Sequence, residues 1–137
     1  LVIVFFDASA LIYLLEGEDP FAGRVRVELA AIAQVHPDAG VAVSRLSWLE
    51  CRVGPMKADD AAALALFDAF FARPDLLWVE LTRDVVELAA AIRVRHGLRT
   101  PDALQAASCL QLGPRHVMLT GDGAFSRVQG LNVTVLA

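Results

Sequence analysis

Short apolar runs alternate with amphipathic segments along the whole chain. Residues 2–6 are apolar at every position, as expected of a strand that is buried on both faces. In residues 21–35, by contrast, Val25, Leu29 and Ile32 recur at helical spacing and leave the charged residues on the opposite face. The pattern predicts strands at 2–6, 41–44, 77–80, 116–120 and 132–136. It predicts helices at 9–16, 21–35, 45–52, 60–73, 83–96, 100–112 and 124–128.

Several helix ends carry their own sequence signals. Gly17 and Gly97 each follow a predicted helix at the position where a left-handed residue commonly closes it. Thr100 is predicted to cap the next helix, with Pro101 in the first turn, where its missing N–H group costs nothing. Gly54-Pro55 is predicted to break the helix that begins at residue 45.

The elements follow one another in the order β-α-α-β-α-α-β-α-α-β-α-β. Strands that are joined through helices imply a mostly parallel sheet of four to five strands with helices on both faces, which is a three-layer α/β/α sandwich. A chain of 137 residues fits a single domain, so we expect residues 1–137 to form one. Such sheets bind their ligands beyond the carboxyl ends of the strands.

The composition is strongly apolar, with 56% hydrophobic residues and a mean hydropathy of +0.52. No apolar run approaches the roughly 20 residues that span a bilayer, so we expect no membrane segment and instead a surface covered by another chain. The run at residues 2–6 lacks preceding basic residues, which favours a strand over a signal peptide. Cys51 and Cys109 have no C-x-x-C spacing, which argues against a disulfide framework or zinc site and fits a reducing cytoplasm.

The formal net charge of −4 argues against a protein that coats nucleic acid non-specifically. It is compatible with an enzyme that binds a few phosphate groups. All basic residues except Lys57 are arginine, which binds phosphate through two hydrogen bonds, although a coding bias explains the same composition. Arg99 is the candidate for holding a phosphate, whereas Arg93 and Arg95 suit the end of a helix.

Two aspartates directly follow predicted strands. Asp7 ends the first strand, and Asp122 follows the fourth strand between two glycines. Each has a structural alternative, because Asp7 also suits a helix N-cap and Asp122 also suits a turn. Ser9 is a second candidate for that cap, which would leave Asp7 free. At the carboxyl edge of a parallel sheet, both aspartates would lie where ligands bind.

Two further acids, Glu50 and Asp102, lie on helices predicted to lean over the same edge. Glu50 also suits an ion pair with Arg52, and the helix dipole alone favours an acid at Asp102. Four like charges repel one another unless a cation joins them. Oxygen ligands without His or Cys partners suit Mg²⁺ or Mn²⁺. Eight further acids are expected to be mostly solvated: Glu16, Glu18, Asp19, Glu28, Asp38, Glu80, Asp84 and Glu87.

With these acids in this order, the chain resembles a known family, the PIN domains, and in particular the VapC-type toxins of bacterial and archaeal toxin–antitoxin pairs. The resemblance covers essentially the whole chain. Four pieces carry it in this order: Asp7-Ala8-Ser9 after the opening strand, Ser44 to Glu50 with Arg52, Thr100-Pro101-Asp102-Ala103-Leu104, and Thr120-Gly121-Asp122 followed by Phe125. The segment containing Gly54-Pro55 is irregular for the family.

The resemblance implies a PIN-like sandwich and Mg²⁺- or Mn²⁺-dependent endonuclease cleavage of RNA. It also implies a small antitoxin partner that covers an apolar groove, and a toxin homodimer. By this likeness the catalytic and metal-binding acids are Asp7, Glu50, Asp102 and Asp122. By the same likeness Ser9 and Thr120 are their polar neighbours. Together with Arg99, the candidate for holding a phosphate, they are the expected substrate-binding residues.

Two other classes compete with this interpretation. A Mg²⁺-dependent phosphoryl-transfer domain also uses acids at parallel strand ends. A receiver domain would need a lysine after a late strand, but Lys57 lies mid-chain, and a phosphatase of the haloacid-dehalogenase type would need an aspartate where Ser9 stands. A non-catalytic binding domain on the same fold would not need all four acids, so their presence counts against it.

Overall fold

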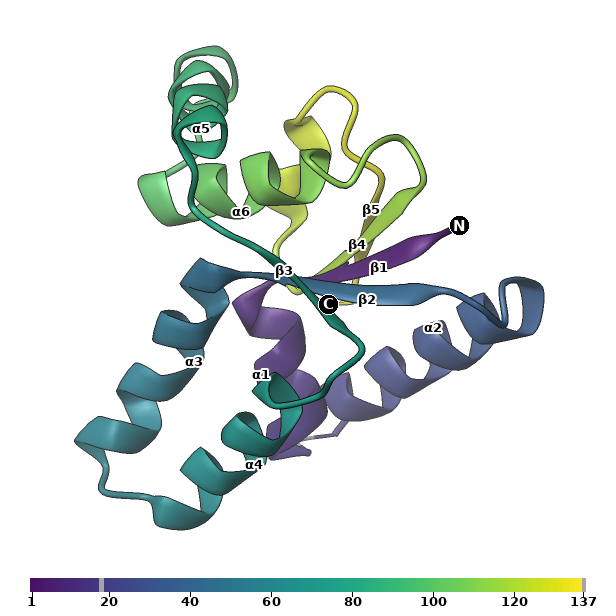
Figure 1. Ribbon diagram of the computed structural model, residues 1–137, viewed down its shortest axis with the longest axis vertical. Coiled ribbons are helices and arrows are strands. Elements are labelled where there is room, and N and C mark those ends of the chain that lie inside the picture. Colours follow the sequence, from purple (N-terminus) through teal and green to yellow (C-terminus); the bar gives the residue numbers. More distant parts are fainter. Residues whose placement is uncertain (18, 137) are drawn as a thin grey trace.

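Five parallel strands form one sheet at the centre of the molecule (Figure 1). The computed structural model describes residues 1–17 and 19–136, so Glu18, which we expected to be solvated, lies outside the described part. The sheet has the order β3-β2-β1-β4-β5, and each neighbouring pair is parallel. This confirms the predicted parallel sheet. The strands are β1 (Ile3–Phe6), β2 (Gly40–Ser44), β3 (Leu76–Val79), β4 (His116–Thr120) and β5 (Val133–Val135).

Helices cover both faces of the sheet, as predicted for a three-layer sandwich. One face carries α1 (Ala8–Glu16), α2 (Phe21–Val35), α3 (Arg45–Lys57) and α4 (Ala61–Phe71). The other carries α5 (Arg83–His96), α6 (Thr100–Leu110) and the short 3₁₀ helix η1 (Gly123–Arg127), as Figure 1 shows. Within the described residues, no helix combines the length and the apolar character that crossing a membrane requires.

The central strand β1 is apolar at every position because helices pack on both of its faces. Val4 and Phe6 join the core beneath α1 to α4, whereas Phe5 points to the opposite core beneath α5 and α6. Phe5 and Phe6 are 0% and 1% exposed. Successive side chains of a strand point to opposite faces, so a strand inside a three-layer sandwich needs apolar residues throughout.

Two predictions about helix ends are wrong, while other predicted helix ends differ from the structure by at most two residues. Helix α3 does not break at Gly54-Pro55 but continues to Lys57. Pro55 lies in the last turn of α3, so the N–H donor that it lacks is lost only near the end of the helix. The carbonyl group of Pro55 still accepts a hydrogen bond from the N–H group of Asp60 at 2.9 Å. The N-cap of α6 is Arg99 rather than Thr100, because the Thr100 hydroxyl accepts a hydrogen bond from Arg93 at 2.8 Å instead.

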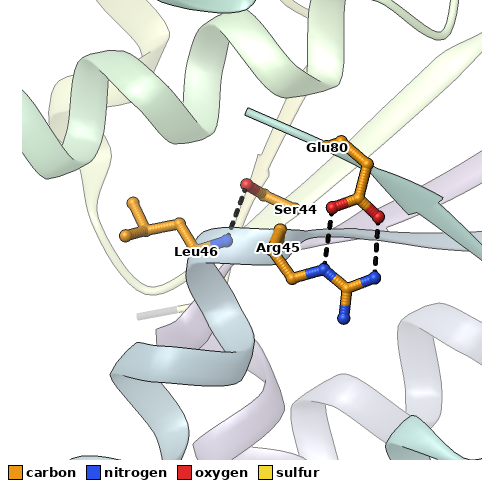
Figure 2. A network of polar contacts seen from close by, with 4 residues as sticks. All are labelled: Ser44, Arg45, Leu46 and Glu80. Carbon is orange, nitrogen blue, oxygen red and sulfur yellow. Dashed lines mark hydrogen bonds and ion pairs between the residues drawn. The ribbon is translucent and has the colours of Figure 1, made fainter. Parts of the chain in front are cut away.

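The start of α3 is fixed to the carboxyl ends of β2 and β3 by the contacts in Figure 2. The Ser44 hydroxyl accepts a hydrogen bond from the backbone N–H of Leu46 at 3.1 Å and so caps the helix. Arg45 donates two hydrogen bonds to Glu80, at 2.8 and 2.7 Å, and its guanidinium lies 3.9 Å from the ring centre of Trp78. Glu80 is thus exposed but paired, and the ion pair joins the residue after β3 to the first turn of the helix that carries Glu50.

Candidate metal centre

The order in which strands are added to the sheet reverses between β1 and β4. From β1 the chain builds outward through β2 and β3, and it then returns to place β4 and β5 on the other side of β1. The carboxyl ends of β1 and β4 therefore meet at the switch point where sheets of this type bind ligands. Asp7 follows β1 directly, and its N–H group donates to the carbonyl oxygen of Leu119 on β4 at 3.3 Å.

Asp7 is almost entirely buried, with 5% exposure, and three donors hold its carboxylate. Oδ1 accepts from the hydroxyl of Ser9 at 2.7 Å and from the N–H of Ala10 at 2.9 Å, and Oδ2 accepts from the hydroxyl of Thr120. Asp7 is thus the N-cap of α1, and Ser9 supports it instead of replacing it. Burial raises the pKa of Asp7, these hydrogen bonds oppose the increase, and the charge of Asp102 adds to it.

The loop after β4 is tied to the same carboxylate. The Ser9 hydroxyl accepts from the N–H of Gly121 at 2.9 Å, and the Thr120 hydroxyl accepts from the N–H of Asp122 at 3.1 Å. Asp122 is exposed, and its Oδ1 caps η1 by accepting from the N–H of Ala124 at 2.9 Å. Ser9 and Thr120 each therefore contact both Asp7 and the loop that carries Asp122.

Glu50 is half-buried on α3 and is held by a residue of α6. Its Oε1 atom accepts a hydrogen bond from the side-chain amide of Gln105 at 2.9 Å. Arg52 pairs with Asp68 on α4, so the suggested ion pair between Glu50 and Arg52 is wrong. Burial raises the pKa of Glu50, the hydrogen bond from Gln105 lowers it, and the charges of Asp7 and Asp102 raise it.

Asp102 lies in the first turn of α6, where its side chain is 23% exposed. The Nε atom of Arg99 lies 3.8 Å from Asp102 Oδ2, and the Arg99 side chain is otherwise open to solvent. Burial raises the pKa of Asp102, the charge of Asp122 raises it further, and Arg99 opposes both effects. An exposed arginine next to a carboxylate leaves guanidinium donors free to bind an anionic ligand.

The pKa effects connect all four acids. Asp7 interacts with Asp102, Glu50 interacts with both, and Asp102 interacts with Asp122. Within residues 1–17 and 19–136, however, no three His, Cys, Asp or Glu side chains come close enough to hold one metal ion among them. The donor set still fits Mg²⁺ or Mn²⁺, because Mg²⁺ keeps several of its waters and is commonly bound through only one or two carboxylates.

Sequence reasoning missed the polar residues that join α6 to β2 and α3. Gln105 donates to Ser47 as well as to Glu50, and Ser108 donates to Ser44 at 3.1 Å. These four neutral residues are 0–2% exposed. The available signal was spacing, since Gln105 follows Asp102 by three residues and Glu50 follows Ser47 by three, which places each pair on one helix face.

The family model described as PIN domain matches residues 4–131. No curated protein sequence matches the chain at a significant level.

Similar solved structures include VapBC2 from Rickettsia felis bound to a promoter DNA fragment, with a TM-score of 0.77 and 14% identity over 99% of this chain and 100% of that chain. A toxin–antitoxin complex from Klebsiella pneumoniae has a TM-score of 0.70 and 24% identity over 98% of each chain. DNA-bound VapBC from Salmonella typhimurium has a TM-score of 0.71 and 16% identity over the full length of both chains. At these identities the likeness establishes the fold.

Proposed function

The chain belongs to the PIN domain family, and on that premise we propose that it is a divalent-metal-dependent endoribonuclease that acts as the toxin of a toxin–antitoxin module. In this proposal residues 1–137 form a single PIN domain that works in the cytoplasm. One observation supports the catalytic part most strongly. Four carboxylates from separate elements interact with one another at the switch point of a parallel sheet, and such a concentration of negative charge favours cation binding.

Asp7, Glu50, Asp102 and Asp122 are the proposed ligands of Mg²⁺ or Mn²⁺, with one or two of their carboxylates on each ion and water in the remaining positions. When bound, such an ion polarises the scissile phosphate and makes a water molecule a better nucleophile at neutral pH. In this proposal one of the carboxylates accepts the proton of the attacking water. Because the pKa values of Asp7, Glu50 and Asp102 each depend on a neighbouring acid, we assign that role to the group and not to a single member.

The polar neighbours of the acids have separate tasks in this proposal. Ser9 and Thr120 use their donors to fix the orientation of the Asp7 carboxylate and to hold the loop that presents Asp122. Arg99 is long, exposed and next to Asp102, so its guanidinium group is free to bind a phosphate oxygen of the RNA backbone. A contact of this kind binds the sugar–phosphate backbone and does not by itself select a base sequence.

The proposed partners are a cognate antitoxin and a second copy of the chain. The solved structures similar to this chain are complexes of VapBC and of a toxin with its antitoxin, which supports a protein partner. Large apolar side chains are exposed on α3 and α4, as expected of surfaces that another chain covers. These residues are Trp48, Leu49, Val53, Met56 and Leu66.

The test is cleavage of an end-labelled structured RNA by the purified protein with Mg²⁺, with Mn²⁺ and with EDTA. We expect metal-dependent cleavage by the wild type and a loss of at least about 100-fold in the Asp102→Asn variant. Equal cleavage by the variant would indicate a contaminating nuclease or a wrong site. An absence of cleavage, with antitoxin binding retained, would favour the non-catalytic alternative. Metal-dependent release of phosphate from a phosphate ester, without RNA cleavage, would favour the phosphatase.

A further inference from the structure

The amide of Gln105 lies in the interface between the two helices that carry Glu50 and Asp102. Gln105 is 2% exposed on α6, one helical turn beyond Asp102. Its Nε2 atom donates to Glu50 Oε1 and to Ser47 Oγ, each at 2.9 Å. Ser47 is fully buried, so the second contact anchors the amide in the protein interior. One side chain of α6 thus holds two successive turns of α3.

From this geometry we propose that Gln105 is a positioning residue that fixes the carboxylate of Glu50 for metal binding. The inference rests on the proposed function and extends it to a residue outside the acidic set. Only the NH₂ end of the amide can face both partners, since a carboxylate oxygen accepts hydrogen bonds and cannot donate them. Gln105 therefore restricts Glu50 to orientations in which Oε1 points to α6 and Oε2 remains for other contacts.

The other end of the amide argues against a purely structural role. Gln105 Oε1 is buried and makes no hydrogen bond within the described residues. An unpaired buried carbonyl group destabilises a fold, and an apolar side chain of the same size would avoid this cost. A side chain that only filled the space between α6 and α3 would avoid this cost as leucine or methionine. The polar side chain gains its benefit through its donor, which binds Ser47 in the interior and Glu50 at the site.

The first measurement is Mn²⁺ binding to the RNA-free protein by isothermal titration calorimetry. Outer partners of metal ligands typically contribute about 10- to 100-fold to affinity, so we expect Gln105→Leu to weaken Mn²⁺ binding at least about 10-fold. Gln111→Leu is the matched control, because Gln111 follows the same helix and, within the described residues, its side-chain amide donates to the carbonyl oxygen of Ala107 and to no acid. It should bind Mn²⁺ as the wild type does. Wild-type affinity in Gln105→Leu would overturn the proposal.

The second measurement separates positioning from structure. Urea unfolding of Gln105→Leu in EDTA measures the structural contribution, in which removal of the unpaired Oε1 atom offsets the lost donor to Ser47 and Glu50, so we expect a midpoint close to that of the wild type. If Gln105→Leu does not fold, Gln105→Met replaces it, since methionine adapts its shape to the same space. A lowered midpoint with unchanged Mn²⁺ affinity would assign Gln105 to the fold alone and overturn the proposal.

A double-mutant cycle identifies Glu50 as the group through which Gln105 acts. In a Glu50→Ala background, Gln105→Leu should reduce Mn²⁺ affinity by less than about twofold, because the acceptor is already absent. Equal losses in both backgrounds would contradict the proposal. A wild-type protein that binds no Mn²⁺ would instead refute the proposed metal-dependent function, and this inference with it. Wild-type binding and RNA cleavage with an unaffected Gln105→Leu variant would refute the inference alone.

Discussion

The hydroxyl group of Thr120 donates a hydrogen bond to the Oδ2 atom of Asp7, although 113 positions separate the two residues in the sequence. The contact joins the last residue of β4 to the residue that follows β1, across the switch point of the sheet. A buried carboxylate needs such donors because it has lost the water that would otherwise solvate its charge. The position of Asp7 therefore depends on β4 as much as on its own strand.

Replacing Thr120 with valine should destabilise the protein. The substitution keeps the shape of the side chain but removes the donor to buried Asp7 and the acceptor for the N–H group of Asp122. Hydrogen bonds to charged groups contribute about 1.5–3 kcal/mol, so we expect a loss of this size in the free energy of unfolding. Urea unfolding at neutral pH in EDTA measures it. The control is Thr134→Val on edge strand β5, which should change stability by less than about 0.5 kcal/mol.

Replacing Asp7 with asparagine should change how stability depends on pH. Burial raises the pKa of Asp7 above its ordinary value of 3.8, so the folded state binds a proton more readily than the unfolded state. The cost of the buried charge is then fully present at neutral pH, and it falls as the pH drops through the folded-state pKa toward 3.8. Asparagine still suits an N-cap and carries no charge.

We therefore expect metal-free Asp7→Asn to unfold at a higher urea concentration than the wild type at pH 7. The difference should shrink steadily as the pH is lowered toward 4. Unfolding curves of both proteins in EDTA, recorded at several pH values, give this comparison directly. A difference that widens on acidification would mean that the ionised form of Asp7 stabilises the fold, contrary to the effect of its burial.

The fold was largely predictable because its local signals agree with its packing. The apolar runs form strands in the structure. Gly17 and Gly97 end their helices with φ of 72° and 69°, as a left-handed cap requires. The wrong predictions concern helix ends whose position depends on a side-chain contact between two helices or on the place of a residue within its helix. The hydroxyl of Thr100 is taken by Arg93, and Pro55 falls in a last turn that tolerates it.

The candidate site was predictable only in part for the same reason. Asp7 and Asp122 follow strands, so the rule for parallel sheets identified their edge without knowledge of any contact. The partner of Glu50 is Gln105, which lies 55 positions away on another helix, and no local pattern around Glu50 indicates it. Buried neutral donors such as Gln105 and Ser47 become visible only once the packing of α6 on α3 is known.

Adding Mn²⁺ should raise the melting temperature of the wild type, and EDTA should reverse the increase. A ligand that binds only the folded state stabilises it by about 2.7 kcal/mol at 100 times its dissociation constant. Asp102→Asn should lose most of this shift, because it removes a carboxylate whose pKa is raised by burial and by the charge of its acidic neighbour Asp122. Asp84→Asn is the matched control, as Asp84 is an exposed acid in the first turn of α5. Equal shifts in both variants would place the bound Mn²⁺ elsewhere.

Replacing Gly121 with alanine should disturb the loop that carries Asp122, whereas the same change at Gly123 should not. A Cβ atom on Gly121 would lie 2.8 Å from Cε2 and 2.9 Å from Cζ of Tyr13, and nearer still to its hydroxyl oxygen. Tyr13 cannot yield freely, because its ring is stacked on Phe21 with 4.7 Å between the ring centres. A Cβ atom on Gly123 meets nothing within 4 Å.

The added methyl group must therefore move either the Tyr13 ring or the loop between Thr120 and Asp122. Overpacking of this kind costs about 1–3 kcal/mol in stability, and a displacement of about 1 Å at a catalytic group can reduce the rate about 100-fold. We expect Gly121→Ala to lower RNA cleavage by at least about 10-fold while Gly123→Ala stays within about twofold of the wild type. Adding Tyr13→Leu to Gly121→Ala should restore part of the activity, since it removes the ring atoms that the methyl group meets. Without such recovery, the loss would have to arise from the backbone of the loop itself and not from its contact with α1.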